Sequence, residues 1–139
     1  MKWSWPGYDG LRHLADLDVP GRYLVVRTEW DGRPVYVHNV YAPVRPEERG
    51  AFYRQLPRDF EETSLHFVGG DFNLYLNSKL DSSNAVPDRN VGRGKVACVE
   101  WLTALRVVDV WRTQHPASRI FIRLSRQRQR EWLVPLLSA

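Results

Sequence analysis

Residues 64–77 read SLHFVGGDFNLYLN, and this stretch decides the fold prediction. Residues 65–68 are mostly apolar and are bounded by a serine and two glycines, which predicts a short buried β-strand. Because Gly69 and Gly70 lack a Cβ, their backbone can come close to a ligand. Asp71 and Asn73 follow directly, so we expect both side chains at the C-terminal edge of a strand, where active sites of layered α/β folds collect.

An acid and an amide two residues apart point to the same side of an extended segment. The carboxylate of Asp71 can take a proton from water or bind a hard cation, and the amide of Asn73 can donate to a phosphate oxygen. The pair could therefore position a nucleophilic water beside a phosphodiester. The structural alternative is an Asx-turn that caps backbone amides at the end of the strand.

Two strands and a helix precede this stretch. Residues 22–30 and 34–41 are rich in β-branched and aromatic residues, and the DGRP sequence between them has turn chemistry, so they predict a β-hairpin. Pro46, followed by two glutamates, predicts the start of a helix that continues to about residue 56, where a proline follows.

A second helix and a further strand follow a polar stretch. Residues 71–92 predict a long surface loop, residues 94–106 a helix and residues 107–111 a strand. The expected buried face of the helix consists of Val96, Val99, Leu102 and Leu105, with a face through Cys98 and Trp101 as the alternative. The order strand–strand–helix–strand–helix–strand predicts a mixed α/β (α+β) domain.

The composition excludes several classes of protein. The single cysteine, Cys98, rules out an intramolecular disulfide and a cysteine-based zinc cluster. No apolar stretch is long enough for a transmembrane helix, and the N-terminus lacks the apolar core of a signal peptide, so we expect an intracellular (nuclear or cytoplasmic) protein that is not secreted. The whole net charge of +4 resides in residues 119–139, which carry five arginines and one acid. Basic character therefore belongs to the tail.

Five motifs in order resemble the endonuclease/exonuclease/phosphatase superfamily, which includes DNase I and the exonuclease III-type AP endonucleases. The VGGDFN sequence resembles its [VIL]-x-G-D-[FLW]-N core, and NVYAP at residues 39–43 resembles its N-x-Y-x-P strand end. The helices at residues 46–56 and 92–105 and the VDVWRTQHP sequence at residues 108–116 match the family in order and spacing. The motif sequences most resemble those of LINE-type retrotransposon endonucleases, and the resemblance covers about residues 20–118.

The resemblance implies a four-layer α/β/β/α sandwich and hydrolysis of phosphodiesters with Mg²⁺ (or Mn²⁺), with DNA as the partner. It assigns Asp71 to orienting or deprotonating the attacking water, with a weak further role as a metal ligand. It assigns Asn73 to the phosphate and the same water, and the Tyr41 hydroxyl to a non-bridging phosphate oxygen. Asn39 is expected to satisfy nearby loop backbone, and Asp109 is expected to be structural near the site.

Several family parts have no match, so we expect a partial domain. Residues 1–20 form a divergent lead with no room for the strands that carry the metal-binding glutamate, residues 21–118 form the core, and residues 119–139 form a divergent arginine-rich tail. No histidine follows His115, so the family's final Asp-His pair is missing too. Losing one acid–base group typically costs about 10²–10⁴-fold in rate. We therefore expect weak or no activity, and a chain that is part of a longer polyprotein.

Two other functions remain open. A non-catalytic remnant could bind nucleic acid through its arginine-rich tail, and the same superfamily also includes phosphatases. Arg89, Arg93 and Arg126 are candidates for nucleic-acid contacts. His38 lies on the strand face opposite Asn39 and Tyr41, which favours a buried, hydrogen-bonded imidazole over a catalytic one.

Overall fold

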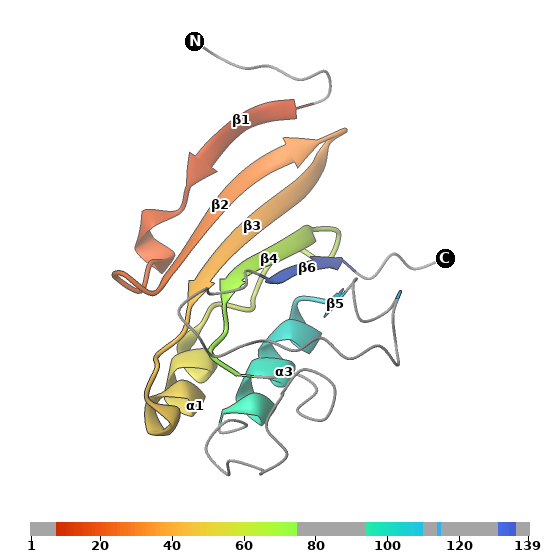
Figure 1. The fold of residues 1–139 in the computed structure, drawn as a ribbon. Helices are drawn as coiled ribbons and strands as arrows, with labels where there is room; N and C mark the ends of the chain where they lie inside the picture. The colour runs from red at the N-terminus through yellow and green to blue at the C-terminus, as the bar shows by residue number, and fades with distance from the viewer. Residues whose placement is uncertain (1–7, 75–93, 110–113, 115–130, 136–139) are drawn as a thin grey trace.

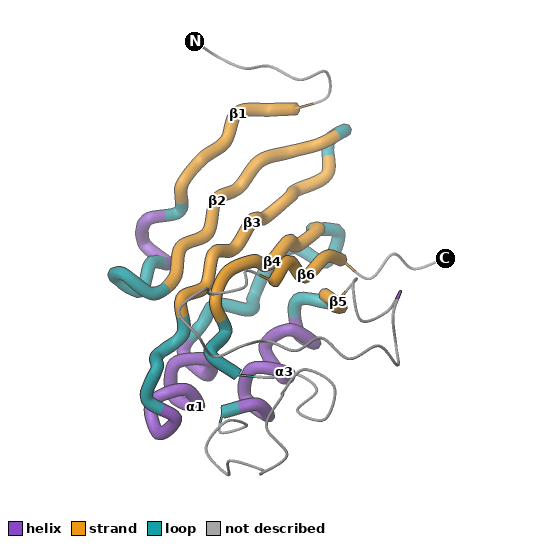
Figure 2. The backbone as a smooth tube through the Cα atoms, viewed as in Figure 1, coloured by secondary structure: helices purple, strands orange, loops and turns teal. Residues whose placement is uncertain are grey.

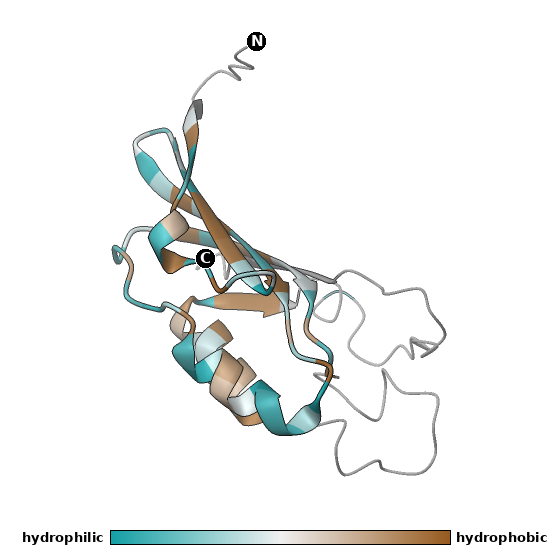
Figure 3. Cartoon of the chain, turned by 90° about the vertical axis from the view of Figure 1, so that its left-hand side faces the viewer, coloured by the Kyte–Doolittle hydropathy of each residue, from teal (hydrophilic) through white to brown (hydrophobic). Residues whose placement is uncertain are grey.

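A computed structural model describes residues 8–74, 94–109, 114 and 131–135. These residues form one six-stranded sheet in the order β1-β2-β3-β4-β6-β5, with helices α1 and α3 packed beside each other (Figure 1). The view turned by 90° shows the helices on a single side of the sheet (Figure 3). The predicted α/β class is confirmed. The described residues form two layers, one of strands and one of helices.

The hairpin of β2 (Tyr23–Trp30) and β3 (Arg33–Tyr41) confirms the prediction within a residue at each end. Asp31 and Gly32 both have positive φ, 50° and 74°, as a two-residue turn between twisted strands requires. The two strands pair antiparallel without a register shift from Trp30↔Arg33 to Tyr23↔Val40. Alternate residues consequently face the helices, and the others face the opposite side of the sheet.

Helix α1 (Pro46–Gln55) connects β3 to β4 (Leu65–Asp71), and these two strands pair in parallel. The helix begins where the sequence predicts, with Pro46 in its first turn followed by two glutamates near the positive end of the helix dipole. It ends at the C-cap Leu56, one residue before a proline. Parallel strands need such a crossover connection. Because the two strands run in the same direction, both end at the same edge of the sheet (Figure 2).

Helix α3 (Lys95–Ala104) confirms the predicted helix, and Leu102 and Leu105 of the expected face are buried, but the two valines of that face are not. Val96 and Val99 are 73% and 41% exposed, whereas Trp101 is fully buried. The alternative face through Cys98 and Trp101 is the buried one, because the indole ring gains far more from leaving water than a valine does. Gly94 precedes the helix with a φ of 87°, and a Cβ there would lie 2.7 Å from that of Arg49 on α1.

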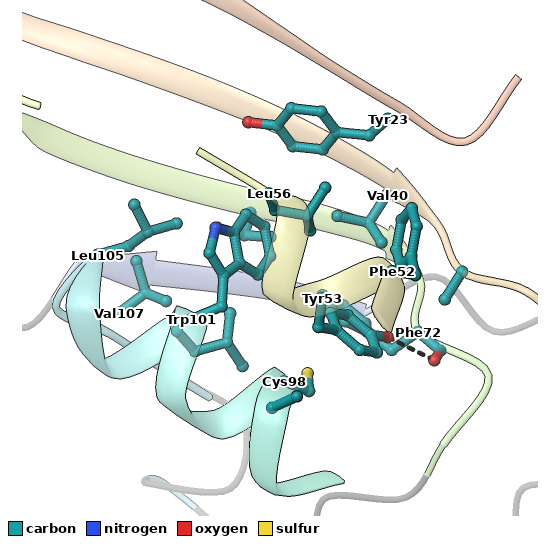
Figure 4. Close-up of a cluster of buried hydrophobic side chains, with 14 of the residues drawn as sticks. Tyr23, Val40, Phe52, Tyr53, Leu56, Phe72, Cys98, Trp101, Leu105 and Val107 are labelled. Atoms are coloured by element: carbon teal, nitrogen blue, oxygen red, sulfur yellow. Dashed lines mark hydrogen bonds between the residues drawn. The ribbon is translucent and has the colours of Figure 1, made fainter. Parts of the chain in front are cut away.

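The core lies between the sheet and the two helices. The indole of Trp101 packs edge-on against the rings of Tyr23 and His38, and its Nε1 donates to the carbonyl of Pro57 at 2.9 Å. Figure 4 shows Trp101 among the other labelled side chains of this cluster. Cys98 is buried in the same cluster. The side chains of this cluster come from the hairpin, β4 and both helices, so the elements that carry the motifs share one core.

Two strands were not predicted. β1 (Tyr8–His13) pairs antiparallel with β2, followed by a 3-10 turn at Ala15–Leu17, so residues 1–20 do contain a strand. β6 (Glu131–Pro135) pairs antiparallel with both β4 and β5 (Val107–Asp109), so part of the expected tail lies inside the sheet. No described helix is long and apolar enough to cross a membrane.

Candidate active site

The ends of β3 and β4 bring two of the predicted site residues together. In the parallel pairing Tyr41 lies opposite Asp71, so both side chains point to the same face of the sheet, away from the helices. The backbone continues the contact, because the Ala42 N–H donates to the Asp71 carbonyl at 2.8 Å. Both side chains are half-buried and reach solvent. A ligand at this sheet edge can therefore touch a phenol and a carboxylate at once.

The backbone after Asp71 turns instead of extending. Asn73 has a φ of 49°, and its N–H donates to Oδ1 of Asp71 at 3.0 Å. This is the Asx-turn that the sequence left as the structural alternative, so the expectation of an extended acid–amide pair is wrong. The carboxylate oxygen that accepts this bond is fixed in place. Its second oxygen is oriented by the same turn.

The Asn73 amide links the two strand ends. Its Nδ2 donates to the carbonyl of Ala42 at 2.6 Å, directly after Tyr41. One amide N–H and the amide oxygen remain for other partners, because the group has two donors and one acceptor. Asp71 and Asn73 are thus hydrogen-bonded to each other, and both are hydrogen-bonded to the backbone of Ala42, which follows Tyr41. The role of each toward a substrate stays a prediction.

A buried tyrosine on α1 holds the turn by a hydrogen bond to its backbone. The hydroxyl of Tyr53 on α1 donates to the Phe72 carbonyl at 2.6 Å, and both residues are buried (Figure 4). Burial raises the pKa of Tyr53, so its phenol remains a protonated donor. Sequence reasoning missed this residue, although Tyr53 follows Phe52 on the apolar face of a predicted helix. The link from helix to turn appears only in the fold.

Gly70 is required by the neighbouring strand. Its φ is 133°, and a Cβ there would lie 2.0 Å from the Val40 carbonyl oxygen. The interpretation that the glycine pair lets a ligand approach is therefore replaced, at Gly70, by a close approach of β4 to β3.

The loop that follows β3 is bound by Arg49 on α1. The buried guanidinium of Arg49 donates from Nε to the carbonyl of Pro43 and from Nη2 to the carbonyl of Val44. These bonds hold the loop that follows Tyr41.

The other predicted residues lie at different places. Asn39 is exposed two residues before Tyr41 and faces the same side of the sheet. Asp109 ends β5, which is separated from β4 by β6. Arg89, Arg93, Arg126 and the motif residues around His115 lie outside the described residues. Within the described part of the chain, no three histidine, cysteine, aspartate or glutamate side chains gather as metal ligands.

A chain of hydrogen-bonded polar side chains, most of them buried, lies on the opposite, helix-facing side of the sheet. We call Tyr23, His38, His66 and Ser64 the histidine chain. Tyr23 Oη lies 2.7 Å from His38 Nδ1, His38 Nε2 lies 2.9 Å from His66 Nδ1, and His66 Nε2 lies 2.8 Å from Ser64 Oγ. The prediction of a buried, hydrogen-bonded His38 is confirmed, and His66 is one of its two partners.

The histidine chain has one possible hydrogen-bond direction. The Ser64 hydroxyl donates its only hydrogen to the Glu61 carbonyl, so it must accept from His66 Nε2. His66 Nδ1 then accepts from His38 Nε2, and His38 Nδ1 accepts from Tyr23. Both imidazoles are neutral in this arrangement. Burial lowers the pKa of His38 to about 3 and that of His66 to about 4, with the neighbouring His66 adding to the effect on His38.

Comparison with known proteins gives a sequence relative and solved structures of similar fold. No family model matches the chain. The uncharacterised 149 kDa protein of transposon TX1 from Xenopus laevis is 34% identical over 110 residues, which cover 74% of this chain and 8% of that protein. The chain thus spans less than a tenth of this relative's length.

Among solved structures, an AP endonuclease from Archaeoglobus fulgidus has the same fold. The TM-score is 0.55 at 21% sequence identity, and the match covers 85% of this chain and 55% of the endonuclease chain. At this level of identity the likeness concerns the arrangement of strands and helices. It agrees with the strand and helix order described above.

Proposed function

Because this chain has the DNase I-like fold of the endonuclease/exonuclease/phosphatase superfamily and resembles a transposon protein, we propose that it is a phosphodiester-hydrolysing endonuclease domain of retrotransposon type. The observation that carries the proposal is the sheet edge where Tyr41 lies opposite Asp71 and Asn73 joins the two strand ends. A phenol and a carboxylate share one face there, and the amide of Asn73 is hydrogen-bonded to the backbone directly after Tyr41.

Each side chain has one role in the proposed reaction. Asp71 accepts a proton from the attacking water, whose oxygen forms a bond to phosphorus while the bond to the leaving oxygen breaks and that oxygen takes a proton from solvent. Tyr41 donates its hydroxyl to a non-bridging oxygen, where negative charge develops in the transition state. Asn73 donates its remaining amide hydrogen to the phosphate. The Asx-turn supports this assignment, because it fixes the Asp71 carboxylate before substrate arrives.

Mg²⁺ or Mn²⁺ is part of the proposal. A Mg²⁺ ion is commonly bound by one or two carboxylates, water and the substrate's phosphate, so the single carboxylate of Asp71 is compatible with such a site. The ion, when bound, would neutralise charge on the phosphate. We expect activity to be weak, because the family's metal-binding glutamate and final Asp-His pair have no counterpart in this sequence.

The similarity to a transposon protein supports the choice of substrate and context. We propose DNA as the substrate and a longer polyprotein as the natural setting. A site of action inside the cell, in the nucleus or the cytoplasm, belongs to the same proposal. The arginines of the C-terminal region would add affinity for the DNA backbone through charge.

Nicking of supercoiled plasmid tests the proposal. We expect slow nicking with Mg²⁺ that is lost with EDTA and in Asp71→Asn, which keeps the size of the side chain but cannot take up the proton. Asp59→Asn, an exposed acid after α1, is the matched control and should leave nicking unchanged. All proteins must first melt cooperatively.

Two other outcomes point to the alternative functions. Absence of nicking by folded protein, with DNA binding that does not depend on Asp71, would favour a non-catalytic nucleic-acid-binding module. Hydrolysis of small phosphomonoesters without nicking would favour a phosphatase. Nicking that is equal in the wild type and Asp71→Asn would reject the proposed site.

A further inference from the structure

A cationic side chain completes a row across the candidate active site. Arg22 immediately precedes β2, and the register Tyr23↔Val40 places it opposite Tyr41, whose N–H donates to the Arg22 carbonyl at 2.6 Å. Tyr41 in turn lies opposite Asp71. Residues that are neighbours across a sheet point to the same face. Arg22, Tyr41 and Asp71 therefore form one row at the ends of three adjacent strands.

The guanidinium of Arg22 lies over the ring of Tyr41, with its Cζ 4.9 Å from the ring centroid. This stacking orients the guanidinium without using its N–H groups. One of them, on Nη1, makes a long bond of 3.4 Å to the Ala42 carbonyl, which is also the acceptor of the Asn73 amide. Arg22 is half-buried and forms no ion pair with a carboxylate of the described residues.

We propose that Arg22 binds a phosphate oxygen of the nucleic-acid backbone at the candidate active site. This inference rests on the proposed function and adds a residue to it. An arginine has five N–H donors in a planar fork that matches a phosphate group. Stacking on Tyr41 holds that fork beside the phenol and the carboxylate, so Arg22 supplies positive charge to a row that otherwise carries only Asp71 as a charged group. It attracts the anion that the carboxylate alone would repel.

The competing explanation is that Arg22 only fastens the backbone after β3 through Ala42. A structural bond of that kind changes stability but does not contribute to the salt dependence of DNA binding. A phosphate contact does, because it releases a counterion from the DNA. The salt dependence therefore separates the two explanations.

Binding of a fluorescently labelled DNA duplex, followed by anisotropy in EDTA at several salt concentrations, is the test. We expect Arg22→Gln to weaken binding by about tenfold and to reduce the slope of log Kd against log salt by about one. Arg22→Lys, which keeps the charge without the fork, should keep the slope and bind with intermediate affinity. The matched control is Arg12→Gln, because Arg12 is exposed on β1. It lies opposite Arg27 and therefore points to the face of the sheet that Arg22 does not share.

A second measurement needs no variant. Phenylglyoxal modifies accessible arginines of the wild-type protein, and mass spectrometry reads each site. We expect the DNA duplex to protect Arg22 and to leave Arg12 reactive. Equal modification of Arg22 with and without DNA would overturn the inference, and so would equal salt slopes for folded Arg22→Gln and Arg12→Gln.

Failure of this inference and failure of the proposed function give different results. Plasmid nicking that needs Asp71, together with DNA binding that ignores Arg22, would overturn the role of Arg22 and leave the endonuclease intact. DNA binding that needs Arg22 without any nicking would support Arg22 as a phosphate contact and reject hydrolysis.

Discussion

Mild acid should destabilise this protein through the histidine chain. His38 and His66 are buried and neutral, with pKa values lowered to about 3 and about 4 from an ordinary value of 6.5. Between these values and 6.5 the unfolded chain binds protons that the folded chain does not, so the free energy of unfolding falls as the pH falls. Each histidine contributes a slope of ~1.4 kcal/mol per pH unit. Near pH 5 that is ~2 kcal/mol for each imidazole, or ~4 kcal/mol together.

This loss is a large share of the stability of a typical domain, which is about 5–15 kcal/mol. The loss caused by the histidines also occurs at a higher pH than the loss caused by protonation of Glu61. The hydroxyl of Tyr36 donates to Glu61 at 2.6 Å and lowers the pKa of that carboxyl below its ordinary 4.5. The stabilisation from Glu61 is therefore present above 4.5 and is lost only as the pH falls further. Above 4.5 the decline belongs mainly to the two histidines.

Urea unfolding followed by tryptophan fluorescence at several pH values measures this decline. The double variant His38→Gln/His66→Gln lacks both imidazoles, so its free energy of unfolding should change little over the same range. His13→Gln, which removes an exposed imidazole hydrogen-bonded to Asp18, should retain the wild-type decline. A wild-type free energy of unfolding that stays constant from about pH 7 to about pH 5 would refute the reasoning, because the buried pair would then take up protons as readily as the unfolded chain.

Three substitutions test the packing around the candidate site by urea unfolding. Gly70→Ala should lower the free energy of unfolding by more than ~3 kcal/mol, because the new Cβ meets a backbone carbonyl and the φ is unfavourable for alanine. Gly10→Ala should be nearly neutral, because a Cβ there has no atom within 4 Å. Equal effects of the two substitutions would contradict the close approach of the strands. Tyr53→Phe should cost about 1–3 kcal/mol by leaving a buried carbonyl without a partner, and a neutral result would remove its role under the turn. Trp101→Ala should cost about 3–5 kcal/mol and Val96→Ala less than ~0.5 kcal/mol, and the reverse order would restore the face of α3 first predicted.

Local signals predicted most of the fold. The hairpin followed from β-branched residues around a DG turn, and α1 followed from Pro46 and the acids after it. The buried face of α3 could not be fixed in this way, because apolar residues occupy both of its stripes. Packing decides between them, and the large ring of Trp101 takes the interior. β6 escaped prediction because its partners β4 and β5 are about 60 and about 25 residues away and its neighbours in sequence are rich in arginine.

The candidate site was predictable as a set of residues but not as an arrangement. The GDFN sequence pointed to Asp71 and Asn73 as polar groups at a strand end, and the resemblance of NVYAP to the family motif added Tyr41. The Asx-turn was an open alternative, and only the backbone φ of Asn73 decided it. Arg22 had no signal at all. Its place beside Tyr41 depends on the register of the hairpin, which residue types alone do not fix.

The position of β6 has a consequence for how this chain folds during synthesis. The strand that joins β4 to β5 leaves the ribosome after both of its neighbours. Until then each neighbour has an unpaired edge, which can template contacts with other nascent chains. Closing a loop of about 60 residues is slow compared with forming the hairpin. We therefore expect a late, rate-limiting step in which the last strand inserts, with chaperone dependence concentrated in the interval before it.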